Sequence, residues 1–560
     1  MDIGSITIVL ILGLLFLIAI GKPLGLASAV VALVVMILKF EPTLLTFPFE
    51  YVGSLFTAAE APDKWVGGIL TGRPGTGPLY LLAQKVFDLL TEYVLISVPL
   101  FIFMAALLER SGLAKDMYDS LNYWLSGVRG GIAIVTSLMA VVLAAMSGII
   151  GGEVVLLGLI ALPQMLRLGY DKNLAIGTIC ASGSLGTMIP PSIVLIMFGV
   201  VTETSIKSLF TGAFIPGAML ATFIIVYIVA RTQIQKHLAP LPDPVPGEPQ
   251  GGEKGWMFLS SVAVVSAVGT VLASIVLLLI TGVRYMRFNG VDQDKVEIFG
   301  LMSSVPMLAI VCAISVAFVA LTVVLRDRQF VEKGWGHTKG LVPPFMVVFI
   351  VMGSIYGGVT GITEAAGMGA FAVLVIAIFR GEFSFELLWD GLMRTLRSTG
   401  TIIWITVGAA MLAGAYTLAG GPAYIADLIV GSEMPTMMIL LAMMLILLFM
   451  GAFMDWVGIV LLIIPVFLPI VRKLPIEEIG FIGQLEPKHI AVWFGVLFCM
   501  NMQVSFLSPP FGPAAFYLKS VAPPSISLGD IFRAFIPFIG VQICALSVLL
   551  IWPSVVTILL

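Results

Sequence analysis

The chain has 560 residues, 59% of them hydrophobic and only 11% charged, and its mean hydropathy is +1.10. Because a soluble protein carries roughly twice that share of charged residues, the composition indicates a membrane protein instead. The net charge of −3 excludes a basic nucleic-acid-binding surface as the dominant feature.

Apolar segments close to the ~20 residues that cross a bilayer recur along the whole chain. The predicted segments are 5–21, 24–39, 93–109, 132–161, 174–201, 208–230, 257–282, 299–325, 342–358, 362–379, 399–419, 435–470, 489–518 and 532–556. Met1–Ile20 begins with an acidic residue rather than a basic region, so we expect a retained first span and not a cleaved signal peptide.

Two of these segments, 132–161 and 435–470, are too long for one span and carry glycines near their centres. We predict that each is a re-entrant hairpin, which enters and leaves the membrane on the same side. Non-helical backbone at that depth is tolerated only where it is buried in protein or faces a water-filled cavity.

The basic residues agree with this interpretation in most connections. If 132–161 is a hairpin, five basic connections face one side, which the positive-inside rule makes cytoplasmic. They contain Arg110, Lys115 and Arg129; Arg167 and Lys172; Arg231 and Lys236; Arg326, Arg328, Lys333 and Lys339; and Arg380, Arg394 and Arg397. The N-terminus and the polar stretch 40–91 then face the periplasm or exterior, and the basic residues of 471–488 fall outside against the rule.

Two further segments are interrupted by serines, glycines and adjacent prolines. The breaks read SGSLGTMIPPS at 182–192 and VSFLSPPFGP at 504–513. Each follows a predicted hairpin, so the order span, hairpin, broken helix, span occurs twice in opposite orientations. The sequence therefore predicts an all-α polytopic membrane fold built as an inverted repeat with two re-entrant hairpins and two broken helices.

One part of the chain lies outside this repeat. The spans 257–282 and 299–325 have no counterpart in the other half, and we interpret them as an insertion, which leaves the sidedness of later spans unchanged. The Pro-rich stretch 231–256 before them is predicted to be an extended loop.

A helix interrupted by Gly and Pro exposes backbone carbonyl and amide groups, and hydroxyl and carbonyl oxygens can coordinate Na⁺. We therefore predict a cation site where each hairpin tip meets its break. The first site comprises Ser147, Gly148, Ser182, Ser184, Gly186 and Thr187. The second comprises Gly451, Met454, Asp455, Ser505, Ser508 and Gly512. The predicted substrate path is lined by Pro190, Pro191, Ser192, Pro509 and Pro510. The alternative is that these small residues serve only close helix packing.

Three carboxylates lie inside apolar segments, where they are costly and usually face a cavity, a cation or a basic partner. Asp455 is predicted at the second hairpin tip, in support of a cation or a proton. Glu153 and Glu364 are possible coupling carboxylates. The alternatives are that Glu364, after Thr363, caps a helix that starts near Ala365, and that Glu153 is solvated at the mouth of its hairpin.

Other kinds of site find little support in the sequence. The four cysteines lie in apolar stretches without CxxC spacing, so we expect small buried residues and no disulfides. The three histidines are far apart, which argues against a zinc or haem site. No Walker A, HExxH or GxSxG motif is present, so we expect no enzyme activity and no organic cofactor.

Four stretches resemble the large membrane subunit of tripartite ATP-independent periplasmic (TRAP) transporters, the DctM-like family. They are LPQMLRLGYDKNLAIGTICASGSLGTMIPPSIVLIMFG (162–199), GVTGITEAAGMGAF (358–371), MGAFMDWVGIVLLIIPVFLPI (450–470) and WFGVLFCMNMQVSFLSPPFGPAAF (493–516). The similarity runs over most of 1–230 and 340–560 in matching order.

The resemblance implies an elevator-type carrier of the ion-transporter superfamily in a bacterial or archaeal cytoplasmic (inner) membrane. It implies import of an organic acid anion by symport with Na⁺, with sodium bound where each hairpin tip meets its broken helix. The implied partners are a small four-span membrane subunit and a periplasmic substrate-binding protein that delivers the substrate.

The chain departs from the family pattern at both predicted sites. Where the first hairpin of the family often reads SGSAVA, this chain has SGIIGGEVV, so Ile149 replaces a serine and Glu153 is added. The second break has Ser508 where TPP is common.

We expect the following organisation: scaffold spans (1–130), first hairpin and broken helix (131–207), a span, loop and inserted pair (208–341), scaffold spans (342–434), second hairpin and broken helix (435–518), and a C-terminal span (519–560). Alternatives to the sodium-coupled carrier are a proton-coupled or stand-alone anion carrier, a channel, or a membrane scaffold without transport.

Overall fold

The computed structural model describes residues 2–40, 77–148, 150–241, 249, 251–287, 298–431, 434–452, 454–510 and 512–560. These residues form helices and connections, without strands. Nine of the helices are long and apolar enough to cross a membrane, and the bent pair Trp456–Leu462 and Ile464–Lys473, with 52° between its parts, raises the number to ten. The prediction of an all-α polytopic fold is confirmed for this part of the chain.

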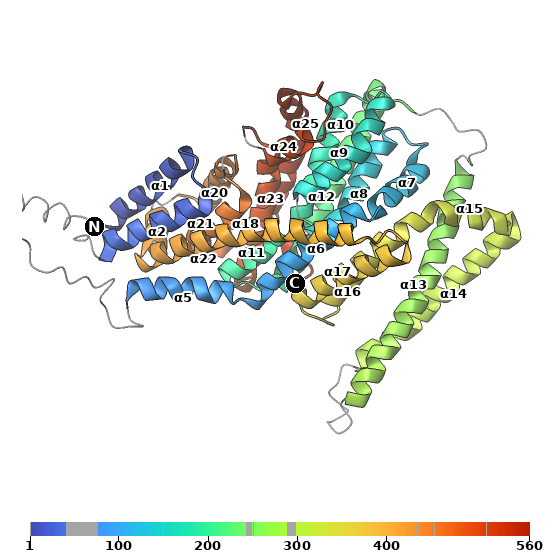
Figure 1. Ribbon diagram of the computed structural model, residues 1–560, viewed down its shortest axis with the longest axis horizontal. Helices are drawn as coiled ribbons and strands as arrows, with labels where there is room; N and C mark the ends of the chain where they lie inside the picture. The colour runs from blue at the N-terminus through green and yellow to red at the C-terminus, as the bar shows by residue number, and fades with distance from the viewer. Residues whose placement is uncertain are drawn as a thin grey trace, which may run out of the picture.

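The N-terminal helices pack against one long helix from the second half. The helices are α1 (Ile3–Ala19), α2 (Leu24–Phe40), α5 (Pro78–Leu90), α6 (Ser97–Arg110) and α18 (Phe385–Leu418). Helix α18 packs along α2, α5 and α6 and runs along the long axis of the molecule (Figure 1). It begins earlier than the predicted residue 399, because the Ser384 side chain accepts from the Leu387 N–H and caps a polar first half.

The first predicted hairpin is two packed helices, and the helix after it is broken as expected. The elements are α8 (Gly131–Ser147), α9 (Ile150–Arg167), α10 (Lys172–Gly183), the 3₁₀ turn η2 (Ser184–Thr187), α11 (Ile193–Thr202) and α12 (Ile206–Ile234). Gly148 takes the left-handed conformation, with φ +62°, where α8 ends, which a residue without a Cβ adopts readily.

The second half repeats this order with one difference. Its elements are α20 (Thr436–Gly451), α21 (Trp456–Leu462), α22 (Ile464–Lys473), α23 (Ile490–Leu507), α24 (Pro513–Lys519) and α25 (Leu528–Ile551). The second arm of this hairpin is bent between α21 and α22, and it continues to Lys473 instead of ending at 470.

The insertion forms a helix pair that extends away from the other helices. It consists of α13 (Gly252–Arg287) and α14 (Ile298–Arg326), which pack side by side (Figure 1). Helix α15 (Arg328–Thr338) then leads back to α16 (Val342–Tyr356) and α17 (Ile362–Phe379). The predicted 231–256 loop is shorter than expected, because α12 continues to Ile234 and α13 begins at Gly252; residues 242–248 and 250 lie outside the described residues.

The sequence pattern did not predict four helices, each of which is shorter than the ~20 residues that cross a bilayer. They are α5, α7 (Leu113–Leu125), α15 and α19 (Gly421–Val430). Part of the predicted polar connection 40–91 is therefore helix α5. The cysteine prediction was wrong at Cys544, which is exposed on α25, while Cys180 and Cys499 are buried and all four thiols are free.

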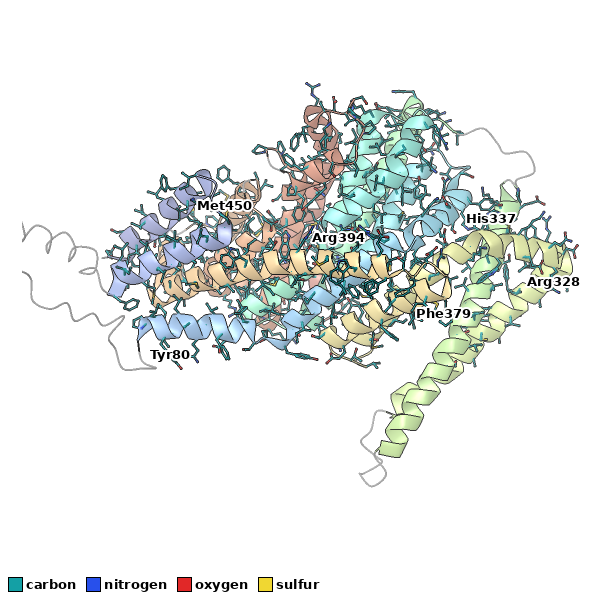
Figure 2. The ribbon with its side chains drawn as sticks, viewed as in Figure 1. Tyr80, Arg328, His337, Phe379, Arg394 and Met450 are labelled. Atoms are coloured by element: carbon teal, nitrogen blue, oxygen red, sulfur yellow. The ribbon has the colours of Figure 1, made fainter. Side chains whose placement is uncertain are left out.

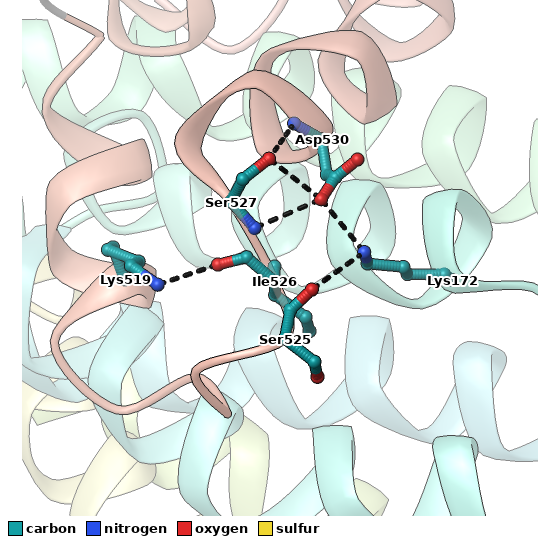
Figure 3. A network of polar contacts seen from close by, with 6 residues as sticks. All are labelled: Lys172, Lys519, Ser525, Ile526, Ser527 and Asp530. Carbon is teal, nitrogen blue, oxygen red and sulfur yellow. Dashed lines mark hydrogen bonds and ion pairs between the residues drawn. The ribbon is translucent and has the colours of Figure 1, made fainter.

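The start of the first broken helix is joined to the start of α25 by an ion pair and a hydrogen bond (Figure 3). Lys172, at the start of α10, pairs with Asp530 at 2.8 Å and donates to the Ser525 carbonyl. Asp530 and Ser527 also form a capping box at the start of α25. Further along, α10 packs against α25, α9 and α8, so the first break lies in the middle of the helix bundle.

Candidate functional site

The tip of the first hairpin touches the first break. A Cβ built at Gly148 would overlap the carbonyl oxygen of Pro191, so the two backbones meet with no room for a side chain. Pro190, Pro191 and Ser192 are buried, and the Ser192 hydroxyl accepts from the Leu195 N–H to cap α11. The predicted meeting of hairpin tip and broken helix is therefore present in the first half.

The hydroxyl groups of the first break are buried and hydrogen-bonded. Ser182 shares a hydrogen bond of 2.8 Å with Ser137 of α8, so it is held by the first arm of the hairpin. Ser184 donates to the Ala181 carbonyl and Thr187 donates to the Ser184 carbonyl, at 2.8 and 3.1 Å. None of the three predicted hydroxyls is more than 2% exposed.

Two buried glutamines complete this cluster, and the sequence reading missed both. Gln503 of α23 donates from Nε2 to the Thr187 hydroxyl at 2.5 Å, and Gln542 of α25 donates to the Ser184 hydroxyl at 3.3 Å. Both side chains are fully buried. Their uncharged polarity inside apolar helices is the signal that would have found them, because buried amides need partners.

Glu153 lies inside the same cluster. Its side chain is 3% exposed, and Ser147 donates its hydroxyl to Oε1. A Cβ at Gly186 would overlap the Glu153 carboxylate, so the carboxylate rests directly on the backbone of the break. The alternative that Glu153 is solvated at the mouth of the hairpin is therefore wrong, because α9 begins at Ile150 and places this residue at the buried tip.

Three side chains that contact the first break carry acceptor oxygens without a donor, as does Asn501 beside the second hairpin. Oε2 of Glu153, Oε1 of Gln503 and Oε1 of Gln542 are buried without a hydrogen-bond partner. A buried acceptor that lacks a donor costs roughly 1–3 kcal/mol, and more when it is charged. Hydroxyl, amide and carboxylate oxygens are hard ligands that suit a cation such as Na⁺, so the residues present fit that ion.

A neighbouring ion pair covers the hairpin from outside. Arg394 of α18 pairs with Glu109 of α6, and a Cβ at Gly152 would overlap that Glu109 carboxylate. Arg394 lies in the first third of α18 (Figure 2). Arg394 is thereby engaged by Glu109.

The second hairpin also contacts its own broken helix. A Cβ at Gly451 would overlap the Ser505 side chain, and Ser505 is 1% exposed. Asn501, eight residues before Pro509, donates to the Met444 carbonyl on α20 at 2.9 Å. Ser182 stands eight residues before Pro190 and bonds to the first arm of its own hairpin in the same way.

The rest of the second break is more open than the first. Asp455 is the N-cap residue of α21 and is exposed, while Met454 beside it is buried. Ser508 is half-buried and donates to the Val504 carbonyl at 2.8 Å, and Gly512, with φ +22°, donates its N–H to the Ser508 carbonyl at 3.0 Å.

Of the predicted substrate-path residues, only Pro509 and Pro510 are exposed. The peptide bonds Pro190–Pro191 and Pro509–Pro510 are both cis. The two breaks therefore share a backbone feature although one is enclosed and the other is open.

Glu364 lies apart from these clusters. It occupies the first turn of α17, is exposed, and accepts a hydrogen bond of 3.0 Å from the Tyr93 hydroxyl. The helix begins at Ile362 with Gly361 as its N-cap, so Glu364 is inside the helix and does not cap one that starts at Ala365. Its position at a positive helix end suits a carboxylate.

Comparison with known proteins agrees with the resemblance found in the sequence. The C4-dicarboxylate TRAP transporter large permease protein DctM of Pseudomonas aeruginosa is 24% identical over 85% of this chain and 88% of its own length. The isethionate TRAP transporter permease protein DctMQ of Oleidesulfovibrio alaskensis is 23% identical, over 86% of this chain and 60% of its own. The 2,3-diketo-L-gulonate TRAP transporter large permease protein YiaN of Escherichia coli is 22% identical, over 85% and 88%.

The family model of the tripartite ATP-independent periplasmic transporter, DctM component, matches residues 10–555, which is nearly the whole chain. The predicted family is therefore confirmed. With its apolar helices, paired hairpins and broken helices, this chain belongs to the DctM component family of tripartite ATP-independent periplasmic transporters.

Proposed function

We propose that this chain is the membrane subunit that carries an organic acid anion into the cell by symport with Na⁺. The observation that supports it is the buried oxygen cluster at the first break. The Glu153 carboxylate rests on Gly186 of the break and accepts from Ser147 at the hairpin tip. One acceptor oxygen each of Glu153, Gln503 and Gln542 has no donor. A monovalent cation would balance the carboxylate charge and supply the missing partner.

The substrate class follows from the relatives, which are named for C4-dicarboxylate, isethionate and 2,3-diketo-L-gulonate. All three are small organic anions. The open second break, with exposed Pro509 and Pro510, is the proposed place where the anion meets the chain. An anion that approaches a bound cation gains an opposite charge in a low-dielectric setting, which explains why the two would travel together.

The proposed partners are a small four-span membrane subunit and a periplasmic substrate-binding protein, as the tripartite family description suggests. The proposed motion is an elevator-type movement of the two hairpins and broken helices against the scaffold helices. The membrane is the cytoplasmic (inner) membrane, with the N-terminus in the periplasm.

The test is uptake into proteoliposomes that contain this chain and its membrane partner, with a binding protein loaded with radiolabelled C4-dicarboxylate outside. Uptake should require Na⁺ and should fall to background when choline replaces Na⁺ at fixed pH and membrane potential. Undiminished uptake in choline would rule out sodium coupling.

A second candidate is a proton-coupled carrier, and the buried carboxylate of Glu153 favours it. In that case uptake persists in choline but depends on a pH gradient. The same vesicles, with an imposed pH gradient and no Na⁺, decide between the two ions.

A further inference from the structure

Helix α23 carries three buried polar side chains within little more than one turn. They are Asn501, Gln503 and Ser505, and none of them is more than 1% exposed. Polar side chains at this depth are costly unless they have a function or a partner. Their arrangement around the helix shows which neighbours each one serves.

Successive residues of an α-helix are rotated by about 100°, so Asn501 and Ser505 share a face and Gln503 lies on the opposite one. The contacts agree with this geometry. Asn501 and Ser505 both face α20, the first arm of the second hairpin, at Met444 and Gly451. Gln503 faces away from that hairpin and donates to Thr187 in the first break.

The other end of the Gln503 amide has no partner. Gln503 Nε2 donates to the Thr187 hydroxyl, which in turn donates to the Ser184 carbonyl. Gln503 Oε1 is buried and receives no hydrogen bond. Since an amide oxygen is an acceptor only, a cation or a donor must approach it to recover its lost hydration. Glu153 Oε2 also has no donor.

We propose that Gln503 supplies a carbonyl ligand to the cation at the first break, and thereby couples that site to the second hairpin. The inference rests on the proposed sodium-coupled function. The ligand comes from the other half of the chain, two residues from Ser505, which packs on the second hairpin tip. A cation that draws Gln503 toward the first break acts on the same rigid turn of α23 that holds this tip.

Gln542 provides a matched control. It too is a fully buried glutamine that donates to a hydroxyl of the first break and has an unpartnered Oε1. It lies on α25, however, which belongs to neither hairpin nor broken helix. Loss of its side chain should weaken the first site without breaking the link to the second hairpin.

Two measurements are made on the purified full-length chain without any substrate: the binding of ²²Na⁺, and the rate at which a water-soluble maleimide labels Asp455→Cys, exposed at the second hairpin tip, in a background without the native cysteines. Saturating Na⁺ should change the labelling rate by ~5-fold or more, the size of a typical coupling between two sites. Gln503→Met, which keeps the length and removes both polar atoms, should weaken binding about 10-fold, as expected for loss of one bond to a charged group, and should abolish the effect of Na⁺ on labelling. Gln542→Met should weaken binding but keep the effect of saturating Na⁺ on labelling.

Each outcome separates the inference from the function on which it rests. A wild-type chain that does not bind ²²Na⁺ refutes the sodium-coupled function and the inference with it. Wild-type binding of ²²Na⁺ that leaves the labelling rate at the second hairpin tip unchanged, or a Gln503→Met protein that binds as the wild type does, overturns the inference alone. If Gln503→Met does not fold, Gln503→Glu decides: its carboxylate keeps the ligand oxygen, so retained or tighter binding supports the proposal and loss of binding in a folded protein contradicts it.

Discussion

The two breaks share a sequence pattern but differ in their surroundings. In the first, the hydroxyls of Ser182, Ser184 and Thr187 are buried, and the nearby carboxylate of Glu153 is 3% exposed. In the second, Ser508 is half-buried and Asp455 is exposed. The same combination of glycine, hydroxyl and paired proline therefore gives an enclosed cluster of oxygens in one half, whereas in the other half Ser505 is buried and the paired prolines are exposed.

The proposed function assigns the ion to the first half and the anion to the second. An enclosed cluster with unpartnered acceptor oxygens suits a small ion that has lost its water, whereas an open break suits a larger solute that arrives from outside. The predictions below test whether the halves differ in this way.

The largest effect is expected from Gly148→Ala. The residue has φ +62°, and a Cβ there would overlap the Pro191 carbonyl, so the hairpin tip must separate from the break. Sodium-dependent uptake should fall by ~100-fold or more, because closely packed backbone cannot yield without moving the ligands.

The control for this variant is Gly420→Ala. Gly420 also has a positive φ, +88°, but a Cβ there meets nothing within 4 Å. Its uptake should stay within ~2-fold of wild type, since only the backbone conformation is strained, by ~1 kcal/mol. Equal losses in both variants would show that strain, and not contact with the break, explains the effect.

The next largest effect separates the two carboxylates. Glu153→Gln removes a buried charge and should weaken Na⁺ activation of uptake by ~10-fold or more, whereas Asp455→Asn, at an exposed position, should change it by ~2-fold. The measurement is the Na⁺ concentration that gives half-maximal uptake. A larger effect at Asp455 would reverse the assignment of the enclosed ion site to the first half.

Accessibility provides a direct test of the enclosure. In a background where the native cysteines Cys180, Cys312, Cys499 and Cys544 are replaced by alanine, Ser508→Cys should react with a water-soluble maleimide at least ~10-fold faster than Ser184→Cys, because a buried thiol is shielded from the reagent. Labelling in denaturant checks that both thiols are present. Equal rates in the folded protein would contradict the contrast between the breaks.

The smallest effect is expected at the ion pair that joins the first broken helix to α25. Lys172 and Asp530 pair at 2.8 Å, but their side chains are 37% and 33% exposed. Lys172→Met should therefore lower stability by less than ~1 kcal/mol. Thermal unfolding in detergent, compared with the exposed pair variant Arg328→Met, measures it; a markedly larger loss would mean that this pair holds the first break in place.

The sequence was sufficient for the hairpins and breaks because their signals are local. Gly148 and the paired prolines end helices wherever they stand, so the positions of both breaks could be predicted. The amphipathic helices α7 and α15 were missed, since their few apolar residues become informative only once a neighbouring surface is known.

The residues that surround the first break were harder to foresee. In the sequence, Ser137 is far from both Gln503 and Gln542. Only the packing of α8, α23 and α25 around the break brings the three side chains together. Glu153 shows the same limit. From the sequence, a carboxylate near a glycine turn can be either solvent-exposed or buried, and only its contact with Gly186 of the break shows that it is buried.

The inserted pair has a consequence for how the molecule sits in a bilayer. Helices α13 and α14 have 36 and 29 residues, which at ~1.5 Å per residue makes them about 54 and 44 Å long, against a hydrocarbon core of ~30 Å. Strong tilt or an extension beyond the headgroups must take up the excess length. In either case the helix pair projects from one side of the protein. Such an asymmetric feature would help to align single-particle images of the molecule.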